Sequence, residues 1–150
     1  MPRTLLVVHH TPSPLTRELL EAVLDGAHDP EITGVDVRSV PALGATVPDV
    51  LAADGFLFGT PANFGYMSGA LKHFFDTVYY PCLGAVAGKP YAAWVHGNDD
   101  TVGAGRAIEK IASGWGLEKV FGTVHIAESG KPARERCYEL GGTVAAGLSI

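Results

Sequence analysis

The chain has 150 residues, of which 47% are hydrophobic and 18% charged, a balance that excludes a disordered chain and fits one globular domain over residues 1–150. Its net charge of −5 argues against nucleic acid as the main partner, because neutralising phosphates requires clustered Lys and Arg. No apolar run reaches the ~20 residues that span a bilayer, and no signal-peptide pattern is present, so we expect a cytoplasmic protein that binds no membrane.

The elements predicted along the chain alternate between strands and helices. Continuous apolar runs predict buried strands, alternating polarity predicts a half-exposed edge strand, and apolar residues three or four apart predict helices. In chain order these are a buried strand at 4–9, a helix at 15–27, the edge strand at 35–40, a proline-punctuated connection at 41–53, a buried strand at 55–59, a helix at 67–78, a buried strand at 91–97, a helix at 107–115, a strand at 119–127 and a closing helix at 132–147.

This alternation predicts an α/β fold, a three-layer sandwich in which helices cover both faces of a five-stranded parallel sheet. The polar second strand belongs at an edge, which favours the strand order 2-1-3-4-5. In that order a ligand binds beyond the carboxyl ends of strands 1, 3 and 4. Three loops meet there, at residues 9–16, 60–68 and 96–103.

These loops lack the residues of other activities that share the topology. A phosphoacceptor domain needs acidic residues after strand 1 and an Asp ending strand 3. At those places the chain has His9, His10, Gly59 and Thr60. The first loop has no cysteine for a cysteine phosphatase, and no serine nucleophile elbow or Walker A sequence is present. His9, His10 and His96 have no carboxylate or thiolate at matched spacing, so we expect no metal site.

The first loop favours an anion. Thr11, Ser13 and Thr16 offer hydroxyls, and the following helix offers unpaired N–H groups and the positive end of its dipole. The alternative is that Ser13 or Thr11 only caps the helix, with Pro14 at its first position.

The second loop favours a flat ligand. Gly59 and Gly65 permit backbone conformations closed to other residues, and Pro61 fixes its own φ. A loop of this kind can present N–H groups to the edge of a planar heterocycle, with Phe64 against its face.

Two stretches resemble a known family. GTPANFGYMSGALKHFFD (59–76) is similar to the isoalloxazine-binding loop of the flavodoxin-like FMN proteins, most closely to the tryptophan-repressor-binding-protein-like NAD(P)H:quinone oxidoreductases. HTPSPLTRELLEAV (10–23) resembles the phosphate loop of the same family, although family loops usually carry Gly where this chain has Pro14. Since Pro12 and Pro14 lack N–H donors, the expected phosphate contacts are the hydroxyls, the side chain of Arg17 and the amides of Ser13, Leu15 and Thr16.

The resemblance implies a flavodoxin-like fold, FMN as cofactor and NAD(P)H as reductant, with a quinone or similar small molecule as acceptor. The residues expected to hold FMN fall into three groups, those at the phosphate (Thr11, Ser13, Leu15 and Thr16), those at one edge and face of the ring (Pro61, Ala62, Asn63, Phe64 and Gly65), and those bordering the ring from the third loop (Gly97, Asn98, Asp99 and Asp100). No side chain is expected as catalytic acid or base, because the flavin N5 carries the hydride chemistry. Asp99 and Asp100 form either a turn or a pair of charges beside the flavin.

Two alternatives remain open at the sequence level. One is a flavodoxin-type electron carrier without turnover of its own, and the other is a flavin-free interaction protein whose first loop lost its cofactor through the two prolines. The third loop supplies no aromatic residue, which leaves one flavin face open or covered by a neighbouring subunit, so a homodimer or higher homo-oligomer is compatible with the sequence.

Overall fold

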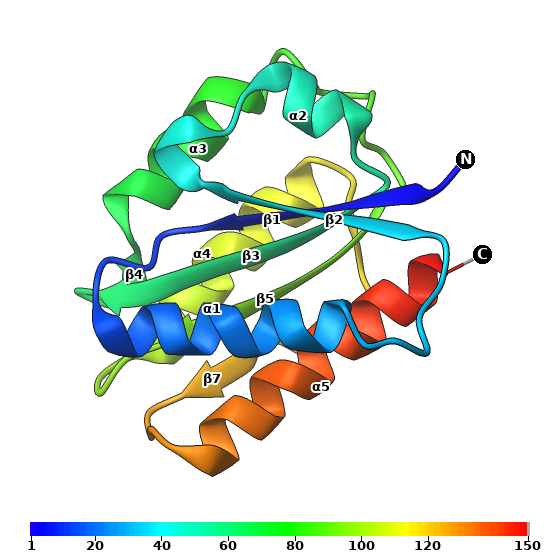
Figure 1. The fold of residues 1–150 in the computed structure, drawn as a ribbon. Coiled ribbons are helices and arrows are strands. Elements are labelled where there is room, and N and C mark those ends of the chain that lie inside the picture. Colours follow the sequence, from blue (N-terminus) through cyan, green and yellow to red (C-terminus); the bar gives the residue numbers. More distant parts are fainter. Residues whose placement is uncertain (150) are drawn as a thin grey trace.

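Seven strands form one sheet across residues 1–149, the part of the chain that the computed structural model describes (Figure 1). The strands are β1 (Arg3–His9), β2 (Val35–Pro41), β3 (Gly55–Asn63), β4 (Tyr66–Met67), β5 (Pro90–His96), β6 (Glu118–Lys119) and β7 (Val124–Ile126). The helices are α1 (Pro14–Ala27), the 3-10 helix η1 (Ala42–Gly44), α2 (Val47–Ala52), α3 (Gly69–Val78), α4 (Thr101–Gly114) and α5 (Lys131–Leu148).

The sheet has the predicted order. The main path runs β2-β1-β3-β5-β6, every pair along it is parallel, and β7 adds to the same side of β5. The predicted order 2-1-3-4-5 is therefore confirmed, with the half-exposed strand β2 at an edge. The carboxyl ends of the strands lie at the left of Figure 1.

The predicted fifth strand, 119–127, is wrong in its continuity. Between its pairings with β6 and β7, strand β5 advances three residues, from Tyr91 to Trp94, while the edge strand advances five, from Lys119 to Val124. Two residues therefore bulge out of the ladder, and the edge breaks into two short strands.

The connection at 41–53 contains two short helices that the sequence reading did not predict. Thr46 caps α2, its hydroxyl accepting from the amide of Asp49, while the Asp49 carboxylate accepts from the amide of Thr46 at 2.9 Å. This reciprocal capping box, with Pro48 in the first turn, gives a helix of six residues. Such a helix is too short to reveal itself through hydrophobic periodicity.

Helices cover both faces of the sheet (Figure 1), and an apolar layer lies between the sheet and the helices on each face. Alternate residues of the strands point to opposite faces, so Leu6 and Phe58 pack under α2, α3 and α4, whereas Leu5 and Leu57 pack under α1 and α5. Helices α1 and α5 lie side by side and touch through glycine. A Cβ at Gly141 would overlap the carbonyl oxygen of Val23.

The two cysteines bear on disulfide bonding, and the helices on whether the chain can span a membrane. Cys82 and Cys137 are free and buried, and burial raises the pKa of the Cys137 thiol to about 12. Among the described helices, none combines the length and hydrophobicity needed to cross a bilayer.

Candidate functional site

The first loop is built around the cap of α1. Ser13 is the N-cap, its Oγ accepts from the amide of Thr16 at 3.2 Å, and its own amide donates to Thr16 Oγ1 at 3.0 Å. The Thr16 hydroxyl also donates to the Ser13 carbonyl at 3.1 Å, and Pro14 stands at the first helical position. The capping role of Ser13, one of the two sequence-level readings, is therefore present in the structure.

This cap leaves a short set of donors for an anion. The amides of Ser13 and Thr16 are already used, and Pro12 and Pro14 have no N–H. Within residues 1–149 the amides of Thr11 and Leu15 have no acceptor. The donors left for an anion are therefore these two amides, the positive end of α1, hydroxyl protons that can turn outward, and the Arg17 guanidinium, whose Nε lies 3.4 Å from the Ser13 carbonyl.

The second loop is a tight hairpin at the end of β3. Asn63 pairs with Tyr66 across a two-residue turn, and both turn residues have positive φ, 53° at Phe64 and 72° at Gly65. Positive φ at both central residues is the requirement of a type I′ turn, which favours Asn or Gly at the position that Phe64 occupies. The Phe64 side chain is fully exposed (107%).

A buried hydroxyl holds this hairpin to the start of α3. Thr60 Oγ1 donates to the Pro61 carbonyl at 2.8 Å and accepts from the Ser68 amide at 2.9 Å. Ser68 in turn caps α3, its Oγ accepting from the Leu71 amide at 3.2 Å. Sequence reasoning did not select Thr60 or Ser68, although a polar residue ending an apolar strand and a Ser three residues before an apolar helix position are recognisable signals.

The third loop packs on the second. Asp100, also with positive φ (48°), caps α4 by accepting from the Gly103 amide at 3.0 Å. A Cβ at Gly103 would overlap the Gly65 carbonyl oxygen, and a Cβ at Gly65 would overlap the Asp100 carboxylate. Asp100 thus forms the turn that the sequence offered as one of two alternatives, while its carboxylate also lies against the second loop.

The rest of the third loop borders the site. The Gly97 amide donates to the Ile126 carbonyl at 3.0 Å, and a Cβ at Gly97 would lie 3.0 Å from the Cβ of Ala62. Asn98 and Asp99 are exposed. The structure therefore brings the expected residues of the second and third loops into contact, and the His10 amide ties the first loop to the carbonyl of Gly59 in the middle of β3, at 2.9 Å.

The role expected for Gly59 needs correction. Its φ is not in the left-handed region, so it serves no unusual backbone conformation. Instead a Cβ there would overlap the indole ring of Trp94, which is buried on the α1–α5 face. Gly59 is required for space alone, whereas Gly65 is required both for its conformation and for the close approach of Asp100.

Histidines lie at the ends of β1 and β5. Burial, reinforced by the neighbouring His10, lowers the pKa of His9, and burial lowers the pKa of His96 against the opposing charge of Glu128. The described residues contain no group of three or more His, Cys, Asp or Glu side chains arranged to hold a metal ion.

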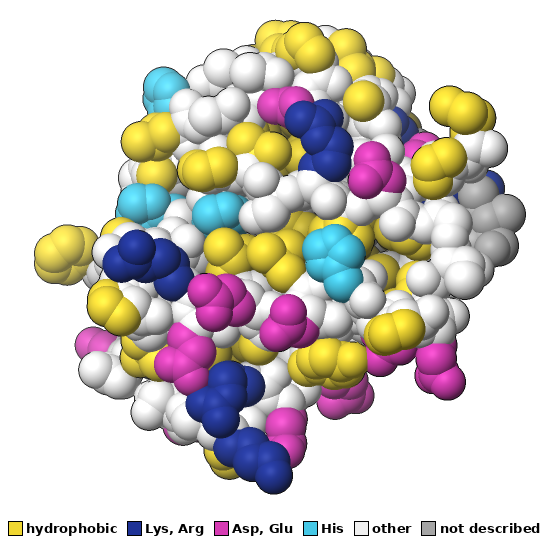
Figure 2. Space-filling model, in the orientation of Figure 1, with side chains coloured by type: hydrophobic (Ala, Val, Ile, Leu, Met, Phe, Trp, Pro, Cys, Tyr) yellow, Lys and Arg dark blue, Asp and Glu magenta, His cyan; other side chains and the backbone are white. Residues whose placement is uncertain are grey.

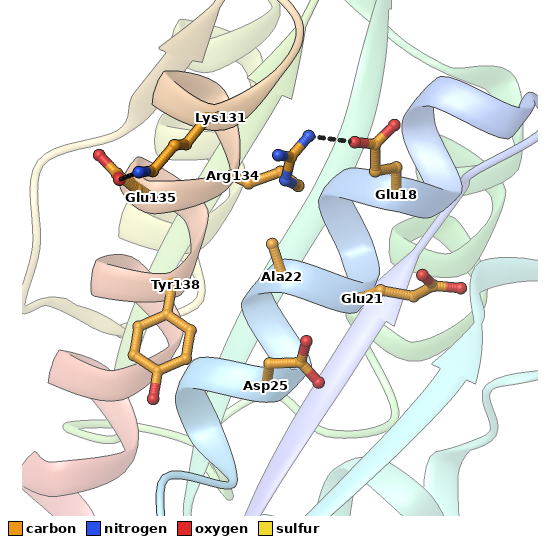
Figure 3. A pocket seen from close by; sticks show the side chains of 8 residues that line it. All are labelled: Glu18, Glu21, Ala22, Asp25, Lys131, Arg134, Glu135 and Tyr138. Atoms are coloured by element: carbon orange, nitrogen blue, oxygen red, sulfur yellow. Dashed lines mark hydrogen bonds and ion pairs between the residues drawn. The ribbon is translucent and has the colours of Figure 1, made fainter.

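A separate groove runs between the outer surfaces of α1 and α5 (Figure 3). Its volume is about 390 Å³, and Arg134 reaches across it to Glu18 with an Nη1–Oε1 distance of 2.7 Å. Acidic and basic side chains are interspersed over these two helices in Figure 2. Because both of its basic side chains, Lys131 and Arg134, pair with glutamates and it lies outside the three loops, we assign no cofactor to this groove.

Comparison with known proteins identifies the family. The family model described as NADPH-dependent FMN reductase matches residues 15–110, which is more than half of the chain. The match includes all of the second and third loops and the end of the first. The chain belongs to this family.

Two relatives carry different names. This chain is 37% identical over 100 residues to a flavodoxin of Aquifex aeolicus, and the alignment covers 63% of this chain and 53% of that protein. It is 33% identical over 90 residues to an NAD(P)H dehydrogenase (quinone) of Acidithiobacillus ferrooxidans, covering 48% of this chain and 45% of that protein. The matches thus span about half the length of these curated relatives.

Solved structures show that the fold is flavodoxin-like. A flavodoxin from Streptococcus pneumonia superposes with a TM-score of 0.81 at 21% identity, covering 97% of this chain and 99% of that one. A WrbA-like flavodoxin from Agrobacterium tumefaciens superposes with a TM-score of 0.77 at 21% identity, covering 99% and 98%.

Proposed function

We propose that this protein binds FMN at the three loops and uses it to pass reducing equivalents from NAD(P)H to a quinone or similar small acceptor. The observation that carries the proposal is Phe64, an aromatic side chain that is fully exposed on a strained, left-handed backbone. Within residues 1–149 the fully exposed Phe64 side chain gains no burial that would offset the strain of its backbone. Strained backbone conformations cluster at sites that hold ligands. A planar ring stacked on Phe64 would remove its apolar surface from water.

The donor set fits a flavin phosphate of modest affinity. Thr11 and Leu15 would donate their amides, the hydroxyls of Thr11 and Ser13 would turn outward, and the positive end of α1 would attract the anion. Thr16 would keep Ser13 in place through the capping box.

The ring would lie between the second and third loops. The hairpin Pro61–Gly65 would supply one edge and the Phe64 face, and residues 97–100 would border the ring from β5 and α4. When bound, the flavin supplies hydride acceptance and release at N5, and the residues of the chain bind it, orient it and set the charge around it.

An open ring face favours the reductase over the carrier. The third loop, Gly-Asn-Asp-Asp at 97–100, contains no aromatic side chain to cover the face opposite Phe64. An uncovered face admits a nicotinamide at stacking distance, which is the geometry that hydride transfer requires. The electron carrier remains the second candidate, because a relative similar over most of this chain is named a flavodoxin.

Anaerobic mixing tests the proposal. The FMN-loaded protein is mixed with NADH or NADPH while the oxidised flavin absorbance is followed, and benzoquinone is then added. We expect prompt bleaching by one of the nucleotides and recovery with the quinone. A flavin that millimolar nucleotide leaves oxidised for minutes, but that a reductase protein reduces, would assign the chain as a carrier.

A further inference from the structure

We propose that His9 positions the Thr11 hydroxyl so that its proton points toward a phosphomonoester at the start of α1. This inference rests on the proposed function, because the ligand is the phosphate of FMN. It assigns a specificity role to a residue that lies under the first loop and that the sequence offered only as a rejected metal ligand.

The geometry places His9 directly beneath the loop. It is the last residue of β1, and it points to the same face of the sheet as Leu5 and Val7, the face that α1 covers. Its side chain is 8% exposed, and Nδ1 lies 3.0 Å from Thr11 Oγ1. The imidazole is thus a buried polar group, and its hydrogen-bond partner is the hydroxyl of Thr11, the residue whose amide is also unpaired.

The tautomer of His9 decides what the Thr11 hydroxyl can do. If Nδ1 carries the proton, it donates to Oγ1, and the hydroxyl proton is free to donate outward. If Nε2 carries it, Nδ1 accepts the hydroxyl proton, and an approaching phosphate meets an oxygen lone pair instead. Burial and His10 keep the pKa of His9 below its ordinary value, so at neutral pH the ring is neutral and one of these two forms must be chosen.

The scarcity of other donors makes this choice matter. Pro12 and Pro14 remove two amides, and the capping box occupies those of Ser13 and Thr16. One well-aimed hydroxyl is then a large share of the donors that face the anion. Because hydrogen bonds to charged groups are stronger than neutral ones, losing it should weaken FMN about tenfold.

Matched substitutions at one pH test the inference. FMN and riboflavin affinities are measured by flavin fluorescence quenching at pH 7.5 for the wild type, His9→Asn, His9→Leu, Thr11→Val and His9→Leu/Thr11→Val. The Asn amide nitrogen can stand where Nδ1 stands and donate to Oγ1, whereas Leu cannot. Urea unfolding of each variant shows which of them remain folded.

We expect His9→Leu and Thr11→Val each to weaken FMN about tenfold and to leave riboflavin unchanged, with no further loss in the double variant. His9→Asn should stay within about threefold of the wild type. Long-range nitrogen–proton NMR of the wild type should show the Nδ1–H tautomer of His9 once FMN is bound.

The outcomes separate this inference from the function beneath it. If the wild type prefers FMN to riboflavin but the His9 variants keep that preference, His9 does not position Thr11 and the FMN site stands. Equal losses for FMN and riboflavin would make His9 a structural residue and overturn the inference. A wild type that binds the two flavins equally, or neither, would overturn the phosphate site and the inference together.

Discussion

At the scale of single residues, the turn of the second loop requires positive φ at two adjacent positions, one occupied by an aromatic residue and the other by glycine. Phe64 adopts a conformation that suits Asn or Gly, and Gly65 adopts one that suits few other residues. The unfavourable conformation of Phe64 points to a ligand, whereas the glycine at position 65 serves the packing of the loop itself. Substitution can therefore separate them.

Replacing Phe64 with Asn should stabilise the ligand-free protein by about 0.5–1 kcal/mol, because Asn tolerates the left-handed region better than Phe. The same change should weaken FMN binding, since the stacking surface is lost. Urea denaturation and fluorescence titration measure the two effects. Leu43→Asn, at an exposed apolar residue of ordinary φ, is the control for simple loss of surface hydrophobicity. A Phe64→Asn protein of lower stability would mean that Phe64 packs within the chain.

Replacing Gly65 with Ala should destabilise the protein by about 1–3 kcal/mol. Part of the cost is the positive φ of 72°, and part is the displacement of the Asp100 carboxylate, which the new Cβ would overlap. Gly84→Ala isolates the first part, because Gly84 has φ 88° and no atom within 4 Å of its added Cβ. Equal urea midpoints for the two variants would show that Asp100 moves aside freely.

At the scale of elements, hydrophobic periodicity predicted the long strands and helices but not the short ones. Strand β5 (Pro90–His96) and helix α1 (Pro14–Ala27) carry enough turns or alternations for a pattern to appear. Helix α2 has six residues and is specified by its capping box, and β4 has two residues and exists because a turn folds it back on β3. Local hydrogen bonding, not periodicity, decides such elements.

The seam between α1 and α5 depends on glycine at the crossing. Gly141→Ala should destabilise the protein by about 2–3 kcal/mol, because the added Cβ would overlap the Val23 carbonyl and force the helices apart. Gly147→Ala, in the same helix with nothing within 4 Å, should be neutral or stabilising by up to about 1 kcal/mol. Thermal or urea unfolding compares them, and similar stabilities would show that the two helices can separate at little cost.

At the scale of the whole molecule, the buried His9 and the partly buried His96 should make stability depend on pH. His9 and His96 have folded-state pKa values lowered by burial, so below about pH 6.5 the unfolded chain takes up protons more readily than the folded one. The free energy of unfolding should therefore fall as the pH is lowered from 7.5 to 5.

The lowered pKa values of Asp49, Glu109 and Glu128 act in a more acidic range, below their ordinary values near 4, and do not obscure this window. Urea unfolding at several pH values measures the slope. His9→Asn/His96→Asn should flatten it, and an unchanged slope would place the titrating groups elsewhere.

The place of the site could be predicted from the sequence because strand order determines it. The side-chain hydrogen bonds within the site could not be predicted. The strand order predicts that three loops meet at one edge of the sheet, and the contacts of Gly65 with Asp100 and of Gly97 with Ala62 join two of them. The sequence offered the cap at Ser13 as an alternative, but the part of Thr16 in that cap, the buried Thr60 hydroxyl and the pairing of His9 with Thr11 depend on rotamers and distances. A sequence without coordinates does not contain these.

The broken edge strand limits how this sheet can be extended. Beside β5 the outer edge offers two stretches of two and three residues, separated by a bulge, instead of one long row of unpaired amides and carbonyls. At the opposite edge, β2 carries Asp36, Arg38 and a final Pro41 that has no N–H to donate. Charged side chains, bulges and proline at sheet edges disfavour pairing with strands of other molecules. If copies of this chain associate, we expect them to do so through side chains of loops and helices, and edge-to-edge aggregation of misfolded chains is disfavoured by the same edge features.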